Sequence, residues 1–265
     1  MVGTRTDLHE FRPWGNTMKI AKFTASALVA ACLTLAGAAP ANATYTASAI
    51  AFAFEDISST GTVIAGLDGA DDTSLSIALL FTFDFFGTSY SSIFVSTNGL
   101  LTFGAGVAAF TNTDLTTSPT QAAIAPFWDD LIVPAGGVLT QTFGAPGSQR
   151  FVIQWNNVSF FSGGAAGDAL TFEATLFQGS NNIQFNYLDL VSGAAGGNNG
   201  ASATVGIKDA GIQGPDRLLL AFNDGPNTFV GSRQSTLIQN VPEPATLGLL
   251  CLALAGLAAS RRRAR

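Results

Sequence analysis

The chain has 265 residues, of which 47% are hydrophobic and 11% charged, and this composition excludes a charge-rich disordered polypeptide. Residues 44–240 carry four basic and fifteen acidic side chains, a net charge of −11, which disfavours contact with nucleic-acid phosphates. The only histidine, His9, and both cysteines, Cys32 and Cys251, lie outside this region, so a Ser-His-Asp triad, a Cys-His pair and a His-containing zinc site are excluded within it.

The N-terminal region has the three parts of a secretory signal peptide. Two lysines lie within four residues of Met18, residues 25–37 are apolar, and Ala41-Asn42-Ala43 is a small-x-small cleavage site. We expect cleavage after Ala43 and export through the inner membrane. Residues 1–17 are polar and do not fit the pattern, so we expect Met18 to be the true start.

The loop LDGADDTS at residues 67–74 is the next feature. Its aspartates, Asp68, Asp71 and Asp72, could offer oxygen ligands to calcium. The loop lacks the spacing of an EF-hand and its Glu at position twelve, and aspartates are also frequent in turns. We expect no resident cofactor, with calcium at these aspartates as the alternative.

The rest of the central region predicts one strand after another. Runs rich in β-branched and aromatic residues are separated by short Gly, Asn, Ser and Asp clusters, and no long helical periodicity is present. We expect strands at residues 74–83, 93–96, 151–155, 170–177, 183–188, 203–207 and 218–222. This pattern predicts an all-β domain at 44–240, either an antiparallel sandwich or a distorted barrel.

Three local patterns refine this expectation. In 170–177, alternation predicts that Leu170 and every second residue after it face the core. Asn98-Gly99 lies between two apolar runs and predicts a tight type I′ hairpin. Asp129 and Asp130 follow Phe127-Trp128. Paired acids beside aromatics suit a carbohydrate-active enzyme or a sugar site. We favour aromatics in the core and aspartates that cap a turn, and we expect no catalytic residue.

The C-terminal residues 241–265 have three parts in a fixed order. Val241-Pro242-Glu243-Pro244 is followed by sixteen uncharged residues and then by Arg261, Arg262, Arg263 and Arg265. As a helix the uncharged run spans about 24 Å, which makes it a short membrane anchor. The arginines act as a membrane stop on the cytoplasmic side, which predicts that the domain lies outside.

This tail resembles the PEP-CTERM sorting signal. The resemblance implies that Pro242, Glu243 and Pro244 are recognised by an exosortase-type processing enzyme. It also implies that the helix anchors the protein in the membrane only transiently. After removal of the helix, the domain would reach the cell surface or the extracellular matrix.

The central region resembles a NIDO-type extracellular domain. The segments that carry the resemblance are FDFFGTSYSSIFVSTNGLLTF, IAPFWDD, RFVIQWNNVSF, LTFEATLFQGSNNIQFNYLDL and ATVGIKD, from about residue 81 to 209. The resemblance implies an extracellular, non-enzymatic, adhesive or matrix-associated module, without catalytic residues to transfer.

Together these features predict a leader at 1–43, a NIDO-like domain at 44–240 and a sorting signal at 241–265. The expected role is structural or adhesive, in exopolysaccharide or biofilm, with extracellular polysaccharide or other surface proteins as partners. One alternative is a polysaccharide-binding module, with or without calcium. Another is a secreted carbohydrate-active enzyme that uses Asp129 or Asp130.

Overall fold

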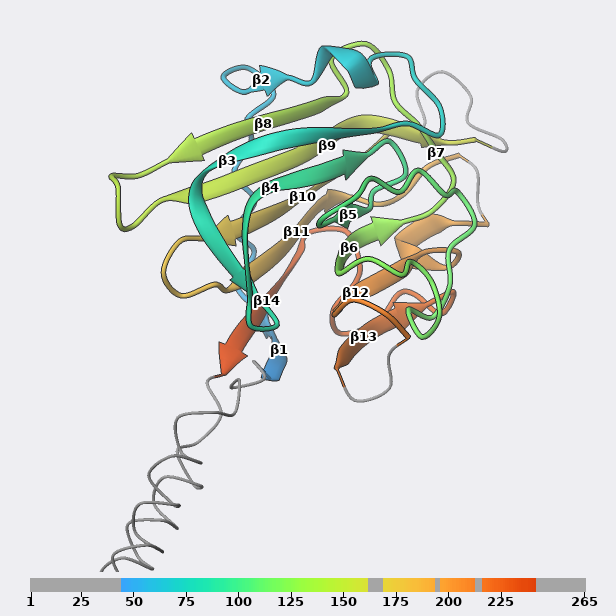
Figure 1. Cartoon of the computed structure of the whole chain (residues 1–265). Coiled ribbons are helices and arrows are strands. Elements are labelled where there is room, and N and C mark those ends of the chain that lie inside the picture. Colours follow the sequence, from blue (N-terminus) through green and yellow to red (C-terminus); the bar gives the residue numbers. More distant parts are fainter. Residues whose placement is uncertain (1–43, 162–168, 194–195, 213–215, 242–265) are drawn as a thin grey trace, which may run out of the picture. The chain divides into compact units, whose positions relative to one another are not determined.

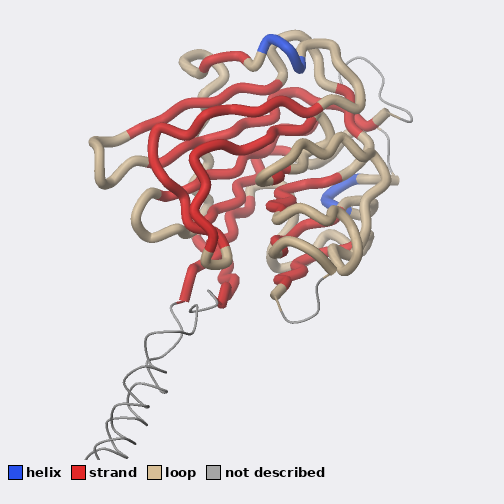
Figure 2. Tube along the Cα trace, viewed as in Figure 1, coloured by secondary structure: helices blue, strands red, loops and turns tan. Residues whose placement is uncertain are grey.

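The computed structural model describes residues 44–161, 169–193, 196–212 and 216–241. These residues form two antiparallel β-sheets, which confirms the all-β expectation and selects the sandwich (Figures 1 and 2). The only helical elements that the described residues contain are two short 3-10 turns, η1 (Ala65–Leu67) and η2 (Asn198–Gly200). None of the described helices has the length and hydropathy needed to span a bilayer.

The first sheet has eight strands, seven of them in one continuous order. In that order they are β1 (Thr44–Ile50), β14 (Gln234–Val241), β11 (Ile183–Asp189), β10 (Leu170–Phe177), β9 (Arg150–Phe160), β8 (Val138–Phe143) and β2 (Thr62–Val63). The short β7 (Leu131–Ile132) pairs with β9 off this path. β1 and β14 are the ends of the described chain, and Thr44 lies opposite Val241.

The second sheet has six strands. In order they are β13 (Arg217–Phe222), β12 (Thr204–Lys208), β6 (Ala123–Trp128), β5 (Leu101–Thr102), β4 (Thr88–Ser96) and β3 (Ser74–Phe85). β4 and β5 form the hairpin expected at Asn98-Gly99. Its turn is not type I′, because Gly99 has a φ of +65° whereas Asn98 is not among the described residues with positive φ. The hairpin therefore needs only one residue in the left-handed region.

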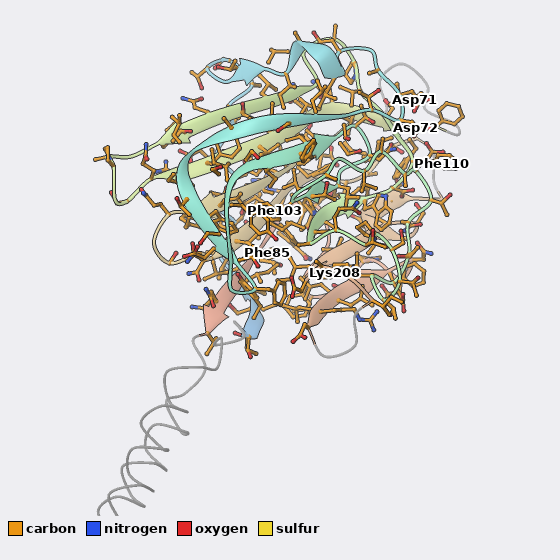
Figure 3. The ribbon with its side chains drawn as sticks, viewed as in Figure 1. Asp71, Asp72, Phe85, Phe103, Phe110 and Lys208 are labelled. Carbon is orange, nitrogen blue, oxygen red and sulfur yellow. The ribbon has the colours of Figure 1, made fainter. Side chains whose placement is uncertain are left out.

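Aromatic side chains fill the space between the two sheets. Phe127 of β6 packs on Phe172 of β10 with ring centroids 5.3 Å apart, and Trp155 of β9 stacks on Phe172 at 5.1 Å. All three side chains are fully buried. Leu170, Phe172, Ala174 and Leu176 all belong to this core, as the alternation in β10 predicts. A second group, which includes Phe85 and Phe103 (5.2 Å apart), extends the core (Figure 3).

The outer face of the first sheet carries a row of buried polar side chains, which we call the polar row. Its four members lie opposite one another on adjacent strands and are at most 2% exposed. They are Gln154 on β9, Glu173 on β10, Asn186 on β11 and Ser235 on β14. Polar groups that are removed from water need hydrogen-bond partners, so something must cover and satisfy this row.

The extended segment at residues 53–57, which we call the crossing segment, supplies that cover. Its alternate amide N–H groups donate to members of the polar row: Ala53 to Ser235 Oγ (2.9 Å), Glu55 to Glu173 Oε1 (3.0 Å) and Ile57 to Gln154 Oε1 (2.7 Å). Asn186 Nδ2 also donates to Glu173 Oε1. Glu173 Oε2 is buried without a hydrogen bond from the described residues. Burial is the main reason why the pKa of Glu173 is raised to about 8.

Candidate functional site

The loop that leads into β3 brings two aspartates next to a third from a distant part of the chain. One carboxylate oxygen from each of Asp71, Asp72 and Asp130 lies within 4.8 Å of the others. Asp71 and Asp72 are exposed, and Asp130 is partly buried. Figure 3 shows Asp71 and Asp72 together at the periphery, away from the aromatic core around Phe85. We call these three residues the acidic cluster.

Asn98 connects the segments around the acidic cluster. Its Nδ2 donates to Asp72 Oδ1 at 2.8 Å and to the Ala108 carbonyl at 3.1 Å. Its Oδ1 accepts from the Leu131 N–H at 2.9 Å, and its backbone carbonyl accepts from the Asp129 N–H at 3.2 Å. Because Asn98 is fully buried and every polar group of its side chain is bonded, it fixes the β4–β5 turn against both acidic segments.

Gly99 permits the close approach on which this arrangement depends. A Cβ atom at position 99 would lie 2.0 Å from the Phe127 carbonyl oxygen and 3.1 Å from Phe172 Cζ. With its φ of +65°, this position both needs a residue that tolerates the left-handed region and has no space for a side chain. The β4–β5 turn therefore packs directly on the backbone of β6.

Asp129 and Asp130 form a turn at the end of β6, as we expected from the sequence. Asp129 Oδ1 accepts from the Asp130 N–H at 2.9 Å, and its Oδ2 accepts from the Ser202 hydroxyl. Burial raises the pKa of Asp129. Burial also raises the pKa of Asp130, and the negative charges of Asp72, Asp71 and Asp129 add to this effect.

The acidic cluster contains two of the three aspartates considered for calcium. Asp68 is not part of it: its Oδ1 accepts instead from the Gly136 N–H at 2.8 Å, which ties two loops together. Asp130, which was considered from sequence as a turn residue, a catalytic acid or part of a sugar site, takes the third place. Three convergent carboxylates are suitable ligands for a hard divalent cation.

The sequence matches the NIDO related family over residues 44–246, which is most of the chain. The chain belongs to the NIDO-related family. Ser96–Gly99 and Ala125–Asp130, which both lie within the stretches that carry the family resemblance, meet at Asn98 and Gly99.

A second match is to the PEP-CTERM protein-sorting motif, over residues 240–263. It confirms the resemblance of the tail, and it implies recognition by exosortase-type processing. The sorting residues Pro242, Glu243 and Pro244 and the arginines at 261, 262, 263 and 265 lie outside the described residues. The expected signal-cleavage residues Ala41 and Ala43 also lie outside them.

Curated relatives of the NIDO-related domain are alpha-tectorins. Mouse and human alpha-tectorin are each 27% identical to this protein over 202 residues, which cover 65% of the chain. The chain spans 9% of the length of these relatives. No solved structure matches. Together with the sorting motif, these matches support an exported extracellular protein whose domain is of a non-catalytic type.

Proposed function

We propose that this protein is a non-enzymatic surface or extracellular-matrix protein with a structural or adhesive role in exopolysaccharide or biofilm. The observation that carries the proposal is the order of the two matches: a NIDO-related domain at 44–246 and a PEP-CTERM motif at 240–263. In this proposal, the C-terminal helix anchors the protein until an exosortase-type enzyme releases the domain. Extracellular polysaccharide or other surface proteins are its partners.

The environment of Asp129 supports a role without catalysis. A general acid needs a carboxyl group that can reach the substrate. Both oxygens of Asp129 instead accept hydrogen bonds from the protein, at the Asp130 N–H and the Ser202 hydroxyl. The Asp129 carboxylate therefore stabilises the turn between β6 and β7, whereas the Asp130 carboxylate belongs to the acidic cluster. We propose no catalytic residue.

Deletion of the tail tests the proposed sorting. Because Val241 is the last residue of β14 and pairs with Thr44, the deletion should begin at residue 242 and leave this pairing intact. We expect the truncated protein to be exported and folded but to lose its cell-surface or matrix location. Surface labelling and cell fractionation measure the location, and the melting temperature checks the fold.

A double variant, Pro242→Ala with Pro244→Ala, is the matched control for this deletion. It keeps the apolar run and the arginines, so we expect it to stay in the membrane fraction uncleaved. An identical distribution of the wild-type, truncated and double-variant proteins would show that the tail does not direct sorting.

Calcium binding at the acidic cluster is a separate part of the proposal. We expect calcium to bind at Asp71, Asp72 and Asp130 and to raise the melting temperature, because the cation would relieve repulsion among three carboxylates. The Asp71→Asn/Asp72→Asn double variant should lose this rise, whereas Asp68→Asn should keep it. Titration calorimetry with calcium chloride that shows neither heat nor a thermal shift would contradict calcium binding.

A further inference from the structure

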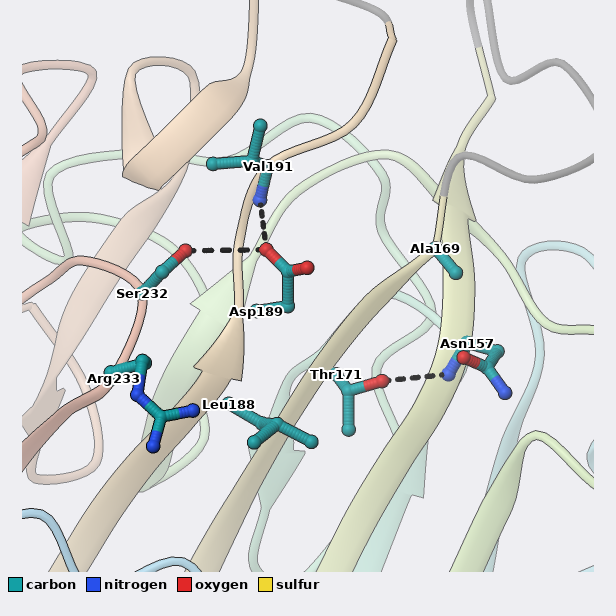
Figure 4. Close-up of a pocket in the computed structure, with 8 residues that line it drawn as sticks. All are labelled: Asn157, Ala169, Thr171, Leu188, Asp189, Val191, Ser232 and Arg233. Carbon is teal, nitrogen blue, oxygen red and sulfur yellow. Dashed lines mark hydrogen bonds between the residues drawn. The ribbon is translucent and has the colours of Figure 1, made fainter.

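A pocket of about 510 Å³ opens on the outer face of the first sheet (Figure 4). Its lining comes from β9, β10, the end of β11 and the residues just before β14, and it includes Asn157, Thr171, Leu188, Asp189, Ser232 and Arg233. The volume lies within the range of about 300–1,000 Å³ that is typical of small-molecule sites. Thr171 lies two residues before Glu173 on β10, so the pocket is next to the polar row.

Arg233 differs from the other basic residues of the described domain because its charge has neither a carboxylate nor a carbonyl partner there. Arg150 is paired with Glu55, and Arg217 with Asp114. Lys208 is buried and donates to the carbonyl groups of Pro119 and Gly211. Within the described ranges, no carboxylate forms an ion pair with Arg233; its guanidinium lies over the Phe52 ring, 5.0 Å from the centroid.

The backbone at the pocket is also unusual. Arg233 has a φ of +59° and Asn157 a φ of +55°, a region that favours glycine or asparagine. A hydrogen bond from the Arg233 N–H to the Tyr187 carbonyl, at 2.8 Å, holds this conformation. Because glycine would fit position 233 with less strain, the presence of arginine favours a use for its side chain.

Hydrogen-bonding groups complete the pocket. Asp189 Oδ1 accepts from the Val191 N–H and the Ser232 hydroxyl, while its Oδ2 has no hydrogen bond from the described residues. Thr171 Oγ1 accepts from the Asn157 N–H at 3.1 Å, which leaves its O–H able to donate. Figure 4 shows Arg233, Asp189 and Asn157 around the same opening.

The charges of the pocket point to the class of ligand. One cation and one carboxylate make the lining neutral overall, and the domain around it carries a net charge of −11 at residues 44–240. A polyanion would be repelled both by Asp189 and by this field. A neutral ligand with adjacent hydroxyl groups can accept from Arg233 and donate to Asp189 at once. The Phe52 ring packs under the Arg233 guanidinium and does not itself line the pocket.

We propose that this pocket binds a neutral polysaccharide, with Arg233 and Asp189 recognising adjacent hydroxyl groups of one sugar unit. The inference deepens the proposed function, on whose extracellular location it depends. The pocket is the surface through which the domain would contact the matrix. Its affinity for a sugar can be measured whether or not the sorting tail is present.

The test uses protein isolated after export and a panel of oligosaccharides, neutral (glucose, galactose or mannose units) and uronate-containing. Binding is measured by saturation-transfer NMR and titration calorimetry. We expect at least one neutral oligosaccharide to bind. Arg233→Gly should lower its affinity at least tenfold, with a melting temperature within about 3 °C of wild type because glycine suits the backbone at this position.

Asp189→Asn and Asp224→Asn form a matched pair for the same assay. In each wild-type aspartate, Oδ1 accepts a hydrogen bond from a backbone N–H, and the Oδ1 of asparagine can accept the same bond. The two positions differ because only Asp189 lines the pocket. We expect at least a fivefold loss for the first and no change for the second. Binding of uronates alone, no binding of neutral sugars, or full affinity in Arg233→Gly would overturn the proposal. A correctly located protein that binds no sugar would reject the pocket and leave the sorting intact.

Discussion

Replacing Glu173 with glutamine is expected to stabilise the domain at pH 8 and to flatten the pH dependence of its stability. Glu173 is 0% exposed, and the pKa of its carboxyl group is raised from 4.5 to about 8, mainly by burial. The folded protein therefore keeps a proton that the unfolded chain loses above pH 4.5. The contribution of Glu173 to the free energy of unfolding is greatest below pH 4.5, falls as the pH rises to about 8, and changes little above that.

The magnitude follows from the size of the shift. At about 1.4 kcal/mol per pKa unit, ionisation of Glu173 removes at most about 5 kcal/mol between pH 4.5 and pH 8. Glutamine imitates the protonated carboxyl group, and its Oε1 can still accept from the Glu55 and Asn186 N–H groups. We expect it to recover several kcal/mol at pH 8 and to change little near pH 4.5. Urea unfolding at pH 4.5, 6.5 and 8 measures this.

Glu173→Ala is the matched control. It also removes the titrating group, but it leaves the Glu55 and Asn186 donors without an acceptor. It should therefore destabilise the domain by about 2–5 kcal/mol at low pH. The raised pKa of Asp129 also makes the free energy of unfolding fall as the pH rises, and this contribution remains in both variants. If glutamine left the pH dependence unchanged, Glu173 would not be the group responsible for it.

Gly99→Ala should be among the most damaging small substitutions in the described domain, with a loss of about 4 kcal/mol or more. The new Cβ would lie 2.0 Å from the Phe127 carbonyl oxygen, so either the β4–β5 turn or β6 must move. That movement would also break the Asn98 hydrogen bonds to Leu131 and Asp72. Chemical denaturation of the exported protein measures the effect.

Gly69→Ala separates the effect of the clash from that of the backbone conformation. Gly69 has a φ of +62°, close to that of Gly99, but a Cβ atom there would meet nothing within 4 Å. We expect this control to lose only about 1–2 kcal/mol, which is the cost of the left-handed conformation alone. If Gly99→Ala does not fold and Gly69→Ala does, the steric clash at position 99 is again the cause. Equal losses in the two variants would contradict it.

The strands that were predicted from sequence are those with apolar, β-branched or aromatic runs, and all seven are strands in the structure. Among the strands that were not predicted, β6 (AIAPFW) is apolar but contains a proline, and two others have weaker patterns. β1 (TYTASAI) is rich in small and polar residues, and β14 (QSTLIQNV) alternates with polar residues on one face. Both become strands because each pairs with the other, and a contact between the two ends of the domain cannot be read from local sequence.

The two faces of β10 show a second limit of prediction. The alternation in residues 170–177 correctly places Leu170 in the core. It also suggests that Thr171, Glu173 and Thr175 face solvent, yet all three are buried. The crossing segment at 53–57 covers this face, and it lies more than a hundred residues earlier in the chain. Similarly, the acidic loop at 68–72 was visible from sequence, whereas its third member, Asp130, depends on tertiary packing.

The position of β14 in the sheet has a mechanical consequence. β14 lies between β1 and β11, with seven aligned residue pairs to the first strand and five to the second. A tensile force applied at Val241 along the strand axis would load the hydrogen bonds of β14 to both neighbours in shear. Under shear these bonds must break together and not one after another. The strand that leads to the sorting tail is thus placed to resist a force applied through that tail.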